Sequence, residues 1–115
     1  MNEAKPIIVP NIITVPPTDQ PEHDYKGFWM DFTIADLYGK KAVRDTYKRA
    51  FDEWKDNVDY YASFVLTLNH RLWMHYDAGR IELAKLYDEL WKKADSYGYR
   101  HFKGDDLIKY HNFLD

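Results

Sequence analysis

The 115-residue sequence contains no cysteine and only five glycines, and each shortage excludes particular kinds of functional site. Without cysteine the chain has no disulfide framework, no thiolate metal centre and no cysteine nucleophile. The glycines form no glycine-rich phosphate loop, and no stretch approaches the roughly 20 apolar residues of a membrane-spanning helix. The opening residues, MNEAKPIIVPNIITVPP, carry an acid and interrupting prolines, which a signal peptide lacks. We therefore expect a protein without a membrane span, in the cytoplasm of its host cell.

Motifs of catalysis and metal binding are also missing. The two serines, Ser63 and Ser96, each fall within a predicted helix, and neither lies in a nucleophile elbow. His70 and His75 stand five residues apart, so their side chains point about 140° apart on a helix, whereas metal-binding pairs use a spacing of four. We read both as surface or boundary histidines, and we expect no enzymatic activity, no metal and no cofactor.

Proline is confined to the first 21 residues, where all five prolines lie. Each removes a backbone donor and favours extended geometry in the residue before it. The residues between them are β-branched and apolar, which suits a strand or an extended arm; they include Ile7, Ile8, Val9, Ile12 and Ile13. The sequence predicts an extended arm over residues 1–31. This arm either docks on its own domain, which we favour, or pairs with a second copy and makes a homo-oligomer.

From Phe32 onward the apolar residues recur at helical spacing, which predicts an all-α fold over residues 32–115. We expect a compact bundle of three main helices plus short terminal helices. Thr33 and Asp36 have the spacing of a capping box for a short first helix, which Gly39 interrupts. The first long helix lies in KKAVRDTYKRAFDEWKDN, with these residues inward: Val43, Tyr47, Ala50 and Trp54.

Two further long helices follow. Asp56 or Asn57 caps the second, Gly79 ends it, and its inward residues are Val58, Tyr61, Val65, Leu68 and Leu72. The third starts near Arg80, and its inward residues are Ile81, Leu83, Ala84, Tyr87, Leu90, Trp91 and Ala94. Gly98 and Gly104 mark its end, and DDLIKYHNFL forms a last short helix.

Two sets of residues on these helices are candidates for contact with a partner. The first long helix carries a basic face made of Lys40, Lys41, Arg44, Lys48 and Arg49. Repulsion along this face would be relieved by phosphates, by an acidic protein surface, or by nearby acids of the chain itself. Trp73 and Tyr76 adjoin the apolar stripe of the second long helix. We favour their burial in the core; the alternative is an aromatic surface for a protein or for stacked bases.

Charge is distributed unevenly along the chain, whose net charge is -3. The excess of acids lies in residues 1–33, and the remainder is balanced. This distribution argues against a protein dominated by phosphate binding.

Four stretches, DLYGKKAVRDTYKRAFDEW, LNHRLWMHYDAG, LAKLYDELWKKAD and KGDDLIKYHNFLD, resemble a group of small uncharacterised helical proteins of bacterial prophages and other mobile elements. Genes of this kind often encode proteins that bind and block a host factor, including host immune nucleases. The resemblance therefore implies a non-enzymatic phage or mobile-element accessory protein, an anti-defence inhibitor comparable to an anti-CRISPR, with a host protein as partner. The alternative is a nucleic-acid-binding protein that uses the basic face.

Overall fold

The computed structural model describes residues 24–114, which form five α-helices. These are α1 (Asp24–Tyr38), α2 (Lys40–Trp54), α3 (Val58–Asp77), α4 (Ile81–His101) and α5 (Asp105–Leu114). All regular structure in this part of the chain is helical, as the sequence predicts. The residues of the predicted arm before Asp24, among them Ile7, Ile8, Val9, Ile12 and Ile13, lie outside the described residues.

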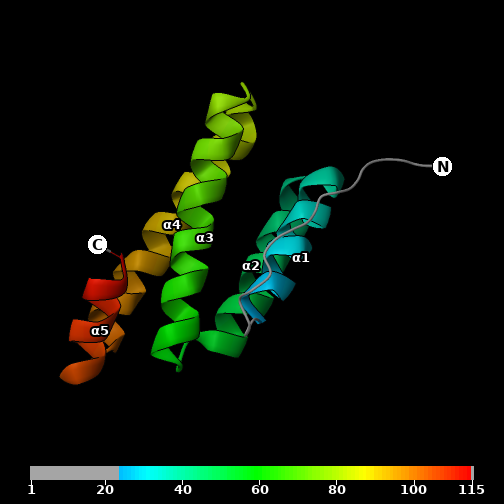
Figure 1. Cartoon of the computed structure of the whole chain (residues 1–115). Helices are drawn as coiled ribbons and strands as arrows, with labels where there is room; N and C mark the ends of the chain where they lie inside the picture. Colours follow the sequence, from blue (N-terminus) through cyan, green and yellow to red (C-terminus); the bar gives the residue numbers. More distant parts are fainter. Residues whose placement is uncertain (1–23, 115) are drawn as a thin grey trace.

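The two longest helices, α3 and α4, form an antiparallel hairpin at the centre of the bundle (Figure 1). Asn57 caps α3 as predicted, because its side chain accepts a hydrogen bond from the backbone N–H of Tyr60 at 3.1 Å. Gly79 adopts a positive φ of 80° between the two helices, which is also as predicted. The α1–α2 pair packs on one side of the hairpin, and α5 packs against α3 and α4.

Aromatic rings fill the core between these helices. Tyr61 of α3 is fully buried, and its ring contacts Phe64, Phe51 and Tyr97 at centroid distances of 5.5, 5.9 and 5.7 Å. The Tyr61 hydroxyl donates to the Ala94 carbonyl oxygen at 2.7 Å, so this ring is buried without an unsatisfied polar atom. The predicted inward residues of α2 and α3 are confirmed as buried or partly buried.

The third long helix differs from its prediction at three positions. Ile81 is exposed, whereas the unpredicted Leu86 is buried. Gly98 does not end the helix, which continues to His101. Gly98 instead lies under the ring of Tyr110 from α5, where a Cβ atom would stand only 2.7 Å from Tyr110 Cε2. The glycine therefore allows α5 to approach α4 closely.

The first helix is longer than predicted and begins at Asp24, so residues 24–31 belong to α1 and not to an extended arm. Thr33 lies within this helix, and its hydroxyl donates to the Trp29 carbonyl oxygen at 3.0 Å instead of capping a helix end. Prolines exclude a helix only up to Pro21, because proline bars the helix at its own position and just before it. The same three helices as predicted follow α1, and Gly39 separates it from α2 with a φ of 112°.

Within residues 24–114, no helix has both the length and the apolar character needed to cross a membrane.

Candidate protein-interaction site

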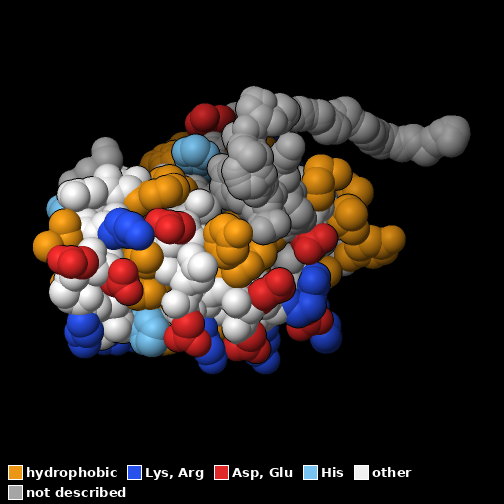
Figure 2. Space-filling view, turned by 60° about the horizontal axis from the view of Figure 1, so that its bottom comes forward, with side chains coloured by type: hydrophobic (Ala, Val, Ile, Leu, Met, Phe, Trp, Pro, Cys, Tyr) orange, Lys and Arg blue, Asp and Glu red, His pale blue; other side chains and the backbone are white. Residues whose placement is uncertain are grey.

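Helix α1 is apolar on two opposite faces. Its inner face carries Phe28, Phe32 and Ala35, which are buried in the core. Its other face carries four exposed apolar side chains at helical spacing, here called the outer stripe: Met30, Ile34, Leu37 and Tyr38. Leu37 and Tyr38 are each 80% exposed. Figure 2 shows hydrophobic side chains gathered at the right of the view, the side on which α1 and α2 lie in Figure 1. A helix with this pattern normally has packing partners on both sides.

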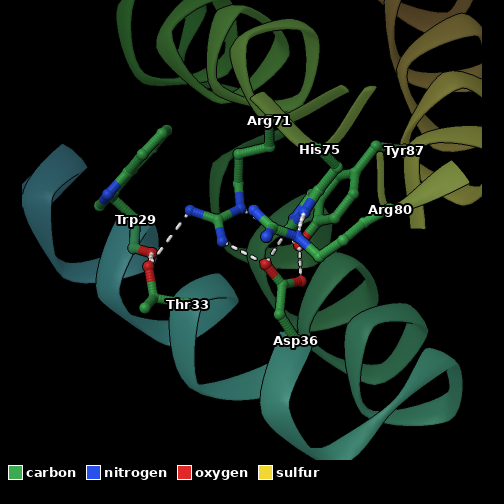
Figure 3. A network of polar contacts seen from close by, with 7 residues as sticks. All are labelled: Trp29, Thr33, Asp36, Arg71, His75, Arg80 and Tyr87. Carbon is green, nitrogen blue, oxygen red and sulfur yellow. Dashed lines mark hydrogen bonds and ion pairs between the residues drawn. The ribbon is translucent and has the colours of Figure 1, made fainter. Parts of the chain in front are cut away.

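A buried polar network joins α1 to the α3–α4 hairpin (Figure 3). The Asp36 carboxylate accepts hydrogen bonds from Arg71 Nη2, from His75 Nε2 at 2.7 Å and from the Tyr87 hydroxyl at 2.6 Å. Arg71 and His75 are only 2% and 3% exposed. The carboxylate belongs to α1, and its hydrogen-bond donors belong to α3 and α4. The network therefore fixes the position of α1 and of the outer stripe on it.

Arg71 is satisfied along its whole guanidinium. Its Nε donates to the Tyr87 hydroxyl and its Nη1 to the Thr33 hydroxyl, both at 3.2 Å. The guanidinium also lies over the Trp29 ring, 4.5 Å from its centroid, in a cation–π contact. A buried arginine is tolerated because each of its three nitrogens donates a hydrogen bond and an ionised carboxylate balances its charge.

The charge state of the network follows from these contacts. Burial raises the pKa of the Asp36 carboxyl, but the hydrogen bond from His75, the Arg71 charge and the hydrogen bonds from Tyr87 and Arg71 together outweigh it, so the pKa lies below the usual value. Asp36 is therefore ionised at neutral pH. Burial raises the pKa of the Tyr87 hydroxyl, which stays protonated and can donate.

His75 is buried, and its prediction as a surface or boundary residue is wrong. Its ring stacks on Tyr87 at a centroid distance of 5.4 Å, and its Nδ1 accepts a hydrogen bond from Arg80 Nε at 2.8 Å. Since Nδ1 accepts, the ring proton is on Nε2, which donates to Asp36. The part of the chain that the structure describes contains no group of three or more metal-ligand side chains.

The basic face of α2 is largely neutralised by acids of the chain itself. Arg44 makes a bidentate pair with Glu89 of α4 at 2.7 and 3.2 Å, and Lys40 pairs with Glu82 at 3.1 Å. Lys41 pairs with Asp45 at 2.9 Å, and Arg49 lies 3.7 Å from Asp31. Among the described residues, Lys48 alone of these five cations has no ion-pair partner. Phosphates, an acidic protein surface and nearby acids of the chain were the three possible ways to relieve repulsion along this face. The structure shows the third, since acids of the chain pair with four of the five cations.

Trp73 and Tyr76 are 52% and 54% exposed, so the favoured prediction that they widen the core is wrong. The two rings meet edge to face at 5.7 Å on the surface of α3. The reason is the shortness of α5, whose Lys109 and Tyr110 contact Asp59 and Tyr61 in the first turn of α3. These contacts leave the face of α3 that carries Trp73 and Tyr76 without a covering helix in the described structure.

Neither the outer stripe nor the polar network is predicted from the sequence. The stripe has a readable signal, because FWMDFTIADLY places apolar residues on all sides of a helix instead of on one. The network has none, since Asp36 lies 35 residues from Arg71 and 51 from Tyr87.

Comparisons with protein-family models, with curated proteins and with solved structures found no match for this chain. The functional argument therefore depends on the site itself.

Proposed function

We propose that this protein is a non-enzymatic protein-interaction module that binds one protein partner through the outer stripe of α1. The observation that carries the proposal is the exposure of Leu37 and Tyr38, on the face of α1 opposite the core. Soluble proteins seldom leave contiguous apolar surface uncovered unless it serves an interaction. The spacing of the stripe is also the spacing with which helices place anchors in an apolar groove of a partner.

The partner class follows from the resemblance to proteins of prophages and mobile elements. That resemblance supports a bacterial host protein as the partner and inhibition of a host defence factor as the consequence of binding. A preformed, rigid stripe suits such a role, because little conformational entropy is lost when it docks.

Binding of nucleic acid by the basic face is the weaker candidate. A phosphate would have to displace Glu89 from Arg44 and Glu82 from Lys40 before it gained either contact. The binding free energy gained from each phosphate contact is therefore reduced by the free energy of the internal ion pair that it replaces.

The test is a capture experiment from bacterial lysate with the full-length chain as bait, quantified by mass spectrometry. Leu37→Asp should reduce the captured partner by at least about tenfold, because it places a charge on one of the two most exposed apolar side chains of the docking surface. The matched control is Ile108→Asp on α5, which changes another exposed apolar residue and should leave capture within about twofold.

Equal capture by Leu37→Asp and the unaltered chain would overturn the proposal. Steep loss of a captured nucleic acid between 50 and 200 mM salt, together with loss on Lys48→Glu, would favour the basic face instead.

A further inference from the structure

The buried network contains one carboxylate and two guanidiniums. Asp36 is ionised, Arg71 and Arg80 are cationic, and His75 is neutral because its Nδ1 accepts from Arg80. The network therefore carries one positive charge that no acid within it balances. No ion pair of Arg80 with an acid is present among the described residues, although the exposed Asp77 lies three positions before it.

The unbalanced charge is presented to solvent at Arg80. All three nitrogens of Arg71 donate within the network and the side chain is buried, so it is not accessible to a ligand. Arg80 is exposed and uses only its Nε, which donates to His75. Both of its Nη groups are without a hydrogen-bond acceptor in the part of the chain that the structure describes.

Arg80 is also held in place before any ligand arrives. The bond to His75 fixes one edge of the guanidinium, and His75 itself is clamped between Asp36 and the Tyr87 ring. The backbone N–H of Arg80 donates to the His75 carbonyl oxygen at 2.9 Å. Part of the entropy that an exposed arginine loses on binding has therefore been lost in folding.

The neighbours of Arg80 are apolar and exposed. Leu37 follows Asp36 in the chain, Tyr76 follows His75, and Ile81 follows Arg80. Each of these exposed residues therefore has its backbone next to a member of the network, and Leu37 links the network to the end of the outer stripe. An oriented arginine among aromatic and aliphatic side chains has the composition of an interface hot spot.

We propose that the two Nη groups of Arg80 bind a carboxylate of the partner, in a short acidic segment whose apolar residues pack on the end of the outer stripe. The assignment rests on the proposed function, since it names the chemistry of the partner at the same surface. Charge complementarity selects this occupant: one unpaired guanidinium favours one carboxylate, with which arginine forms parallel hydrogen bonds.

The test uses a display library of random twelve-residue peptides, selected in parallel on the full-length chain and on Arg80→Gln. Selection on the unaltered chain should yield peptides with an Asp or Glu beside apolar residues. Fluorescence anisotropy with a selected peptide should show affinity falling at least about tenfold for Arg80→Gln. The matched control is Arg100→Gln, a change at an exposed arginine of α4, the helix that begins directly after Arg80, which should alter affinity by less than about twofold.

A double-mutant cycle identifies the contact. Replacing the acidic residue of the peptide by its amide should weaken binding to the unaltered chain but add little further loss with Arg80→Gln. Circular dichroism melting of Arg80→Gln must show an intact bundle.

Three outcomes of the peptide experiments would overturn the inference. These are selection of peptides without acids, equal affinity for Arg80→Gln, and failure to select any peptide. None of them decides the proposed function, which is judged by capture with Leu37→Asp. Arg80-dependent binding of the oligonucleotide dT12 in place of an acidic peptide would also overturn it, in favour of phosphate.

Discussion

Removing either charge of the buried pair between Asp36 and Arg71 should destabilise the fold strongly, and removing both should cost less than the sum of the two single changes. Arg71→Met deletes the guanidinium and its three hydrogen bonds while a long side chain still packs against Trp29. The Asp36 charge is then left in a site that is only 10% exposed, with His75 and Tyr87 as its remaining donors. Breaking a buried pair in this way lowers the free energy of unfolding by about 3–5 kcal/mol. A domain of this size has only about 5–15 kcal/mol in total.

Asp36→Asn should lower the free energy of unfolding by a similar amount, because it leaves Arg71 charged and buried. The double variant removes both charges, so its loss should fall short of the sum of the single losses by about 2 kcal/mol. Urea denaturation at pH 7, followed by circular dichroism at 222 nm, measures all four corners of the cycle. Additivity within about 0.5 kcal/mol, or a cost of Arg71→Met below about 1 kcal/mol, would refute the reasoning.

Three further predictions concern α5, a helix cap and the buried tyrosines. Gly98→Ala should lower the free energy of unfolding by about 1–3 kcal/mol, because the new Cβ overlaps the Tyr110 ring; faster hydrogen exchange in α5 would locate the effect. Asn57→Ala should cost about 1 kcal/mol through loss of the cap of α3, measured by the same urea titration. Burial raises the pKa of Tyr47 to about 12 and that of Tyr61 still further. Their stabilising contribution is complete below pH 10 or so and is lost as the pH rises beyond it, so absorbance at 295 nm should rise in two stages, the second coinciding with unfolding.

Local signals predicted those parts of the fold that local physics determines. The helix cap at Asn57, the turn at Gly79 and the inward stripe of α3 were all predicted correctly. Each depends on residues only a few positions away, so the neighbouring sequence is enough to predict it. Trp73 was placed wrongly for a different reason. Its burial depends on whether another helix covers the end of α3, and α5 is too short to do so.

The candidate site depends on contacts between distant parts of the chain. Arg44 and Glu89 lie 45 residues apart, so the sequence showed a row of cations on α2 but not the acids of α4 that neutralise them. Likewise, the sequence identifies Arg80 only as the start of a helix. Its role depends on the hydrogen bond from its Nε to His75, which orients the guanidinium and which the sequence does not reveal.

The polar network also explains how a helix with two apolar faces adopts one orientation. Burial of apolar surface alone would stabilise α1 with either face inward, since both faces carry large apolar side chains, Met30, Ile34 and Leu37 on one and Phe28 and Phe32 on the other. Asp36 lies at the edge of the inner face, and only in the observed rotation does it reach Arg71, His75 and Tyr87 at once. In the inverted rotation these groups would lose the Asp36 carboxylate, and the buried Arg71 charge would be left without an acid, at a cost of several kcal/mol. The network thus selects which face of α1 enters the core, and by doing so it keeps the outer stripe available to a partner.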